Sequence, residues 1–153
     1  MNIEIERKFL INHIPNGIEN SIHIIQYYLH IDENFVQRLR LFNHEKSILS
    51  IKQNCEGMSR HEFEYEIPFD DAKKIISMGS YKYVEKNRHI ISIGSHLWEI
   101  DEFLGKNKGL VIAEIELQSE NDDISFPKWI DKEVTNQNKY YNYNLATKPY
   151  ISW

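Results

Sequence analysis

Charged and apolar side chains alternate at the start of the chain. Glu4, Glu6 and Lys8 occupy every second position, and Ile3 and Ile5 lie between or beside them. Successive side chains of a β-strand point to opposite faces, so a strand here would carry two carboxylates and one ammonium on one face and apolar groups on the other. The pattern predicts a strand whose apolar face is covered by other parts of the protein and whose charged face borders water.

Further stretches rich in β-branched and aromatic residues also predict strands. With the first one, they cover residues 2–10, 22–31, 35–43, 46–54, 60–67, 82–94, 96–103 and 110–118. The third and fourth stretches are separated only by the turn-forming residues 43–45, which indicates a β-hairpin. So many strands in succession predict a mostly antiparallel sheet or barrel.

Helices contribute little to the predicted fold. Residues 70–76 follow Pro68 and begin with acidic residues, as expected of a short helix. A second short helix is expected near residues 139–146, in a C-terminal third that is otherwise polar and irregular after Glu120. No linker or repeat interrupts the chain, so residues 1–153 are expected to form a single domain. The predicted fold class is mainly β, within the α+β group.

The alternation of the first strand recurs in the later ones. Most of the later strands again place at least one charged residue, and usually more than one, on a single face. Strand by strand, these residues are Arg38 with Arg40, Lys52 (beside Ser50 and Ile48), Glu62 with Glu64 and Glu66, Lys86 with Arg88, Glu99 with Asp101, and Glu114 with Glu116. Two arrangements explain such a pattern. In a sandwich these faces would simply meet solvent, whereas in a closed barrel they would line a hydrated tunnel. The periodicity alone does not decide between them.

A tunnel with this lining would suit one kind of ligand. Buried ions are costly unless they are paired, so the tunnel would have to be wide and wet. Arginine and lysine bind phosphate oxygens, and pairs of carboxylates bind hard divalent cations that also bridge to phosphates. The basic side chains are Lys8, Arg38, Arg40, Lys52, Lys86 and Arg88. Charges of both signs on the inner faces therefore predict a phosphate-containing ligand and a divalent metal.

The bulk composition excludes several other classes of protein. The formal charge of −5 argues against general affinity for nucleic acid. The single cysteine, Cys55, allows neither an intrachain disulfide nor a thiolate-rich zinc site, and no histidine pattern near it supports a nucleophilic role. No apolar run approaches the ~20 residues of a membrane span, and the charged N-terminus is unlike a secretory signal. We expect a cytoplasmic protein without membrane or nucleic-acid partners; its oligomeric state stays open, a homodimer included.

The charged motifs, taken in order, resemble the CYTH domain family, also called the triphosphate tunnel metalloenzymes. They are Glu4-x-Glu6-x-Lys8, Arg38-x-Arg40, Ser50-x-Lys52, Ser59-Arg60-x-Glu62-x-Glu64-x-Glu66, Glu85-Lys86-x-Arg88, Glu99-x-Asp101, Glu114-x-Glu116, Lys132-x-x-Thr135 and Lys139-x-x-Asn142. The resemblance spans nearly the whole chain, and the length is similar to that of the small bacterial members. Two positions depart from the family pattern: Asn87 stands where relatives often have Thr or Ser, and Lys139 where many have Arg.

The resemblance implies an eight-stranded antiparallel β-barrel around a triphosphate tunnel, with a few short helices. It assigns the binding of Mg²⁺ or Mn²⁺ to four carboxylates, Glu4, Glu6, Glu114 and Glu116. It assigns substrate binding to the basic residues Lys8, Arg38, Arg40, Lys52, Lys86 and Arg88. The residues that orient those bases or complete the metal shell would be Glu62, Glu64 and Asp101.

The activity that the resemblance implies is metal-dependent hydrolysis of a small-molecule triphosphate. The expected substrate is inorganic tripolyphosphate, cleaved to pyrophosphate and phosphate by in-line attack of water. Glu114 or Glu116 would orient or deprotonate that water, and Lys86 would stabilise the leaving phosphate. No covalent enzyme intermediate is required.

Other activities stay open on the same tunnel. A class IV-type adenylate cyclase would need contacts for adenine, and no feature of the sequence provides them. A thiamine triphosphatase would need an aromatic platform at the tunnel mouth, for which the candidates are Tyr27, Tyr28, Trp98 and Trp153. A non-catalytic sensor of polyphosphate or nucleotide is an alternative of another class, although a pure anion binder gains nothing from so many carboxylates. The sequence also leaves open whether the tyrosine-rich segment 140–143 belongs to a helix that plugs one end of the tunnel.

Overall fold

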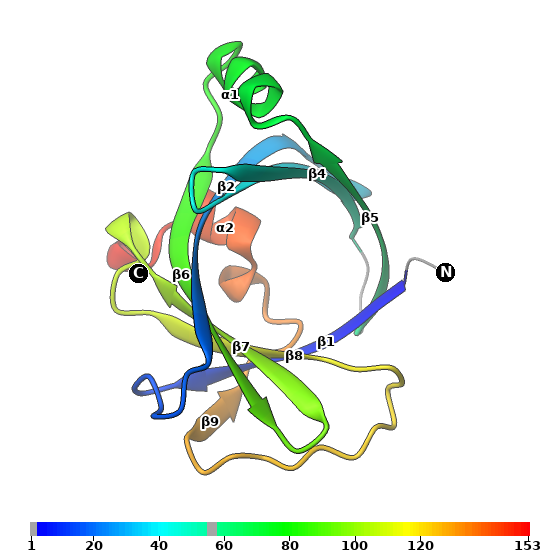
Figure 1. Cartoon of the computed structure of the whole chain (residues 1–153), viewed down its shortest axis with the longest axis vertical. Coiled ribbons are helices and arrows are strands. Elements are labelled where there is room, and N and C mark those ends of the chain that lie inside the picture. Colours follow the sequence, from blue (N-terminus) through cyan, green and yellow to red (C-terminus); the bar gives the residue numbers. More distant parts are fainter. Residues whose placement is uncertain (1–2, 55–57) are drawn as a thin grey trace.

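One antiparallel sheet organises the structure, which is a computed structural model. It describes residues 3–54 and 58–153, so Cys55 lies outside the described residues. The strands are β1 (Ile3–Ile11), β2 (Asn20–Ile31), β3 (Phe35–Phe42), β4 (Lys46–Gln53), β5 (Ser59–Ile67), β6 (Tyr83–Ile93), β7 (His96–Phe103), β8 (Val111–Glu116) and β9 (Ile130–Glu133). They follow the order β5-β4-β3-β2-β6-β7-β8-β1-β9, and a further pairing of β5 with β1 closes eight of them into a barrel (Figure 1). The predicted eight-stranded antiparallel barrel is confirmed, with each predicted strand ending within two residues of its observed bounds.

Helices are few and short, as predicted. In the described residues they are α1 (Phe69–Ser77), α2 (Asn142–Thr147) and the 3₁₀ turns η1 (Gly105–Asn107), η2 (Asn138–Tyr140) and η3 (Tyr150–Ser152). The helix predicted after Pro68 is α1, whereas the one expected near residues 139–146 is divided between η2 and α2. None of the helices in this part of the chain combines the length and the apolar character that a membrane-spanning helix needs.

The first strand closes the barrel. Its N-terminal part pairs with β5, which places Glu4 opposite Arg60. Its C-terminal part pairs with β8, which places Lys8 opposite Glu114. Side chains alternate across a closed sheet, so this register sends charged residues at alternate positions of β1, β5 and β8, such as Lys8, Glu62 and Glu114, to the same interior.

The ninth strand was not predicted, and the segment after Glu120 is therefore less irregular than expected. β9 extends the sheet beside β1, with Phe9 opposite Glu133, Ile11 opposite Ile130 and a register shift between these two pairs. Arg7 donates two hydrogen bonds to the Glu133 carboxylate, from Nε at 2.9 Å and from Nη2 at 2.7 Å. A strand of four residues is too short to show a periodic pattern in the sequence, so only its contacts with β1 identify it.

The predicted hairpin between β3 and β4 is confirmed, and its turn has an identifiable cause. Asn43 and His44 have φ values of 51° and 57°, the left-handed region that both central residues of a type I′ turn adopt, and the Glu45 N–H donates to the Phe42 carbonyl at 3.0 Å. Asparagine tolerates this conformation better than most residues. The Asn43 side chain also accepts a hydrogen bond from the His23 backbone N–H at 2.9 Å, which ties the turn to β2.

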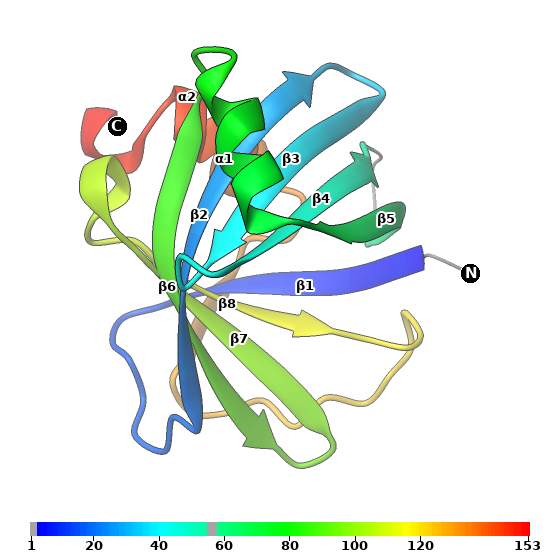
Figure 2. The same cartoon turned by 45° about the horizontal axis from the view of Figure 1, so that its top comes forward.

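The apolar outer face of the barrel is covered on two sides. α1 lies across β2, β3 and β4, where Ala72 packs with Leu39 and Leu41 (Figure 2). On the opposite side, Trp98 and its apolar neighbours on β1, β6, β7 and β8 pack under the loops before β2 and after β8, which contribute Ile14 and Trp129 among others. These covers resolve the choice left by the sequence: the apolar faces point outward into small cores, and the charged faces point inward.

One end of the barrel interior is apolar. Tyr28, Val84, Phe103 and Ile112 lie on the same strand faces as the inner charges but nearer this end, and they pack with Leu145 of α2. Leu145 has no exposed surface, and α2 appears inside the ring of strands in Figure 1. The C-terminal segment thus packs into one end of the barrel interior, while the charged residues line the remainder.

Candidate active site

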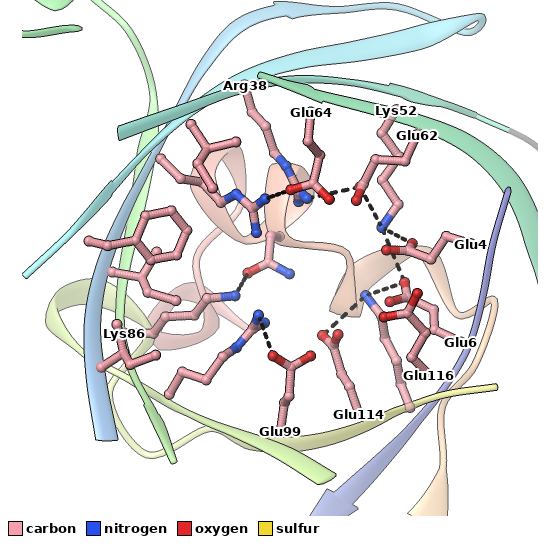
Figure 3. A pocket seen from close by; sticks show the side chains of 18 of the residues that line it. Glu4, Glu6, Arg38, Lys52, Glu62, Glu64, Lys86, Glu99, Glu114 and Glu116 are labelled. Atoms are coloured by element: carbon pink, nitrogen blue, oxygen red, sulfur yellow. Dashed lines mark hydrogen bonds and ion pairs between the residues drawn. The ribbon is translucent and has the colours of Figure 1, made fainter. Parts of the chain in front are cut away.

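The charged part of the barrel interior encloses a cavity of about 270 Å³ (Figure 3). Thirteen charged residues line it: Glu4, Glu6, Lys8, Arg38, Arg40, Lys52, Glu62, Glu64, Lys86, Arg88, Glu99, Glu114 and Glu116. Every predicted site residue except Asp101 is among them, and Asp101 lies fully buried behind Lys86 and Arg88. The alternation of charges in the sequence therefore correctly predicts which charged residues line this cavity.

The four carboxylates expected to bind metal lie together on one side of the cavity (Figure 3). They come from β1 and β8, which pair with Glu6 opposite Glu116. Lysine side chains lie between them: Lys52 Nζ is 2.6 Å from Glu4 Oε1 and 3.3 Å from Glu6 Oε1. The two strands thus concentrate negative charge on one wall, with lysine ammonium groups reaching into it.

Negative charge on this wall exceeds what the nearby lysines neutralise. Burial raises the pKa of Glu4, and the adjacent Glu6 carboxylate raises it further against the opposing effect of Lys52. Burial likewise raises the pKa of Glu114 and of Glu116. Glu6 differs: burial would raise its pKa, but Lys52 and other nearby cations outweigh burial and lower it. A bound cation would favour the ionised form of all four carboxylates.

The carboxylate wall fits a hard divalent cation. It offers oxygen donors, which Mg²⁺ and Mn²⁺ prefer, and the buried Glu4 Oε1 has the Lys52 ammonium beside it as an ion-pair partner. Within the part of the chain that the structure describes, no three His, Cys, Asp or Glu side chains are already arranged around one point as a metal site. Lys52 and Lys8 lie among the carboxylate oxygens, so these lysines would have to turn toward another anion before a metal binds.

Arginine side chains dominate another part of the wall. Arg38 donates to Ser50 Oγ at 2.9 Å and to Glu62 Oε2 at 3.0 Å, and Arg40 forms an ion pair with Glu64. Glu62 and Glu64 thus contact the arginines, as expected of residues that orient them. Burial, together with the charges of Arg38 and Arg88, lowers the pKa of Arg40 to about 10.

Arg40 also has an unfilled hydrogen-bonding position. Its Nε is buried and has no hydrogen-bond partner among the described residues. A buried donor without an acceptor is costly. The repulsion from neighbouring cations and the unsatisfied Nε are both relieved if an anion binds against this wall.

Lys86 and Arg88 share one buried carboxylate. Asp101 Oδ2 accepts a hydrogen bond from Lys86 Nζ at 2.7 Å, and both Asp101 oxygens accept from Arg88, at 2.8 and 2.9 Å. Only 1% of Lys86 and none of Asp101 is exposed. Burial lowers the pKa of Lys86 to about 8, since Asp101 offsets this effect only in part and Arg88 adds to it.

Three residues of the site were not assigned a role from the sequence. Glu99 lies on the cavity face of β7 and accepts a hydrogen bond from Arg88 Nη1 at 3.1 Å. The alternation of charges in the sequence includes Glu99 but does not indicate what it binds. Arg60 lies beside a small adjoining cavity and acts electrostatically on Glu6. Asn142 reaches the cavity from α2 and accepts a hydrogen bond from Lys86. The sequence motifs include both Arg60 and Asn142, but only the folded structure shows which residues these two side chains lie beside.

Aromatic side chains provide little of the cavity wall. Among the described residues that line it, Phe42 is the aromatic one, beside aliphatic groups such as Ile24 and Ile48. Tyr28 instead belongs to the apolar end of the barrel and Trp98 to an outer core. None of the four candidates for an aromatic platform lines the cavity.

Comparison with known proteins places these features in a family context. The sequence profile of the CYTH domain matches residues 2–149. A protein of Acetivibrio thermocellus named inorganic triphosphatase is 41% identical over 152 residues, which are 98% of this chain and 97% of the relative. An inorganic triphosphatase of Nitrosomonas europaea is 31% identical over 146 residues, or 94% of this chain and 96% of the relative.

Solved structures share the same architecture. The crystal structure of an inorganic triphosphatase matches with a TM-score of 0.68 at 29% identity, covering 94% of this chain and 93% of that chain. A protein from Hippeastrum, described as an adenylyl cyclase with a dominant triphosphatase activity, matches with a TM-score of 0.56 at 13% identity, covering 78% of this chain and 80% of that chain. The second likeness shows the fold alone.

Replacing Asp101 with asparagine should destabilise the protein strongly. Asp101→Asn would leave the buried Lys86 without its carboxylate partner and Arg88 with Glu99 alone, and breaking a buried ion pair in this way typically costs about 3–5 kcal/mol. Urea unfolding followed by circular dichroism measures the change. As a control, Glu66→Gln removes an exposed ion pair with Lys46 and should leave the unfolding midpoint almost unchanged. Equal effects of the two substitutions would contradict the importance of the buried carboxylate.

Proposed function

Since the chain belongs to the CYTH domain family, we propose that it hydrolyses inorganic tripolyphosphate to pyrophosphate and phosphate. The observation that carries this proposal is the cavity, in which a wall of crowded carboxylates and a wall of crowded cations line one space. Such a site favours a polyanion together with a divalent cation. The relatives named inorganic triphosphatase support tripolyphosphate as the substrate.

The basic residues would bind the phosphate chain. Lys86 has three ammonium hydrogens, and Arg40 has a buried Nε that lacks a partner. Guanidinium groups bind phosphate oxygens through paired hydrogen bonds, and ammonium groups bind them as compact charges. The full set proposed for this role is Lys8, Arg38, Arg40, Lys52, Lys86 and Arg88. Together they would hold the substrate and stabilise charge on its equatorial oxygens.

The carboxylates of β1 and β8 would hold the metal. We assign this role to Glu4, Glu6, Glu114 and Glu116, with Mg²⁺ or Mn²⁺ as the ion. When bound, a divalent metal neutralises phosphate charge and lowers the barrier to attack by water. Substrate would draw Lys8 and Lys52 away from the carboxylates, which frees oxygens that these lysines contact in the structure.

A glutamate of β8 would prepare the water. Glu114 and Glu116 both line the cavity, so a carboxylate oxygen that the metal does not occupy would be available to a water molecule there. One of them would orient the water and accept its proton as the oxygen attacks the terminal phosphorus. The bond from that phosphorus to the bridging oxygen breaks, orthophosphate forms, and Lys86 stabilises the pyrophosphate that departs.

Phosphate release tests the proposal directly. Tripolyphosphate, ATP and thiamine triphosphate are each incubated with the protein and Mg²⁺, Mn²⁺ or EDTA, and cyclic AMP is measured in the ATP reactions. We expect release that is fastest from tripolyphosphate and is abolished by EDTA. Cyclic AMP would identify a cyclase instead, preference for thiamine triphosphate would identify that substrate, and binding without any turnover would identify a sensor.

Removing one carboxylate from the metal wall should abolish turnover. Glu4→Gln or Glu116→Gln removes a charged oxygen donor, and loss of the metal's contribution of several kcal/mol predicts a fall in kcat of about 100-fold or more. Steady-state phosphate release measures the rate, and thermal unfolding checks the fold. The matched control is Glu102→Gln on the outer face of β7, where Glu102 contacts His89. Full activity of both inner variants would rule out the metal assignment.

Arg40→Ala should weaken the binding of tripolyphosphate more than that of pyrophosphate or phosphate. Hydrogen bonds to charged groups contribute about 1.5–3 kcal/mol, so KM for tripolyphosphate should rise about 10- to 100-fold. Inhibition by pyrophosphate and by phosphate gives their affinities in the same assay. An equal loss for all three anions would contradict a site that binds the whole chain of phosphates.

A further inference from the structure

The C-terminal helix contributes one polar side chain to the cavity. Asn142 is the first residue of α2 and lines the cavity together with residues of the barrel strands. Its Oδ1 accepts a hydrogen bond from Lys86 Nζ at 3.1 Å. α2 itself is fixed by Leu145, which is fully buried among the apolar residues at one end of the barrel. The position of Asn142 is therefore set by packing outside the cavity.

Lys86 depends on this contact because the carboxylate with which it pairs in the described part of the chain is shared. Asp101 accepts hydrogen bonds from Lys86 and also binds Arg88 through both of its oxygens. Asp101 thus serves both buried cations, although Arg88 has a second carboxylate partner in Glu99. Among the described residues, Asn142 is the other hydrogen-bond acceptor that Lys86 contacts. The amide oxygen therefore helps to keep the ammonium charged in a buried position.

The two contacts also fix the direction of the ammonium group. An ammonium has three N–H donors. Asp101 and Asn142 occupy two of them, from β7 and from α2. One donor is left for an anion in the cavity, which Lys86 lines.

We propose that Asn142 is a positioning residue for Lys86: it holds the Lys86 ammonium charged and aimed at the phosphate chain, and it makes the C-terminal helix part of the active site. The proposal rests on the proposed triphosphatase function for its kinetic consequences. The contact itself, and its effect on Lys86, stand independently of turnover.

The expected consequence is a change in pH dependence. Among the described residues, the charged groups that act on Lys86 include Asp101, Arg88, Glu114 and Glu99, and Asn142 is uncharged. Only protonated Lys86 binds phosphate oxygens as a cation, so kcat/KM should fall as pH rises through its pKa of about 8. Removing the Asn142 oxygen takes away an acceptor for the charged form, which lowers this pKa and moves the alkaline fall to lower pH.

The test compares two leucine substitutions on one helix. Asn142→Leu removes the acceptor at similar volume, and we expect the alkaline midpoint to move down by about one pH unit with an increase in KM of about tenfold. Asn144→Leu removes the hydrogen bond to Asn138 without touching Lys86, so it should lower the melting temperature but leave the pH profile unchanged. An unchanged profile in Asn142→Leu, or the same shift in both variants, would overturn the proposal.

A direct titration keeps the inference separate from the proposed function. NMR of the lysine side-chain nitrogens reports the pKa of Lys86 whether or not the protein has activity. Asn142→Leu should lower that pKa, and Asn142→Asp should raise it because a carboxylate replaces the amide. An unaltered Lys86 pKa in both folded variants would refute the positioning role. Shifts in the expected directions without tripolyphosphate hydrolysis would retain that role and refute the proposed function.

Discussion

Closure of an antiparallel sheet forces charge into the interior of this protein. In a closed barrel every second side chain of each strand points inward, and here most of these positions along one part of the barrel are ionisable. Each ion that leaves water must be compensated by a partner or a ligand. Pairs such as Lys86 with Asp101 and Arg38 with Glu62 satisfy this requirement in part. The pairing of β1 with β5 and β8 thus creates both the cavity and the demand for a ligand of mixed charge.

Charge is incompletely neutralised on both walls of the cavity, with excess negative charge on the carboxylate wall and excess positive charge on the arginine wall. Burial raises the pKa of Glu4 and Glu114, whereas burial and neighbouring cations lower that of Arg40. An ion of opposite charge would stabilise each wall. Lysines that contact the carboxylates, such as Lys52, neutralise part of the acidic wall, but their ammonium groups are then engaged there and not with an anion. A polyanion accompanied by a divalent cation meets both demands at once, so electrostatics and family membership lead to the same class of ligand.

The sequence predicted those features that depend on a repeated contrast between two environments. The inward faces of most strands are charged and the outward faces are largely apolar. The resulting alternation along the sequence predicts the eight barrel strands and the charged residues that line the cavity. β9 escaped because a strand of four residues repeats too little to be recognised. Asn142 lies 56 residues from Lys86 in the chain, and their contact depends on how α2 packs against the barrel. No local pattern encodes such a contact, and the motif that contains Asn142 could not indicate its partner.

The inner faces of the same strands are apolar at one end of the barrel and charged along the rest of it. The inner face of β6 changes from Val84 to Lys86 within two residues, and that of β7 from Phe103 to Asp101. This boundary excludes water from one side of Lys86 and Asp101, which strengthens the attraction between them. The same loss of water disfavours the charged ammonium, and this larger effect lowers the pKa of Lys86. Because α2 fills the apolar end and also supplies Asn142, its packing places a polar side chain in the cavity wall. The helix that completes the hydrophobic core thereby also contributes a group that Lys86 contacts.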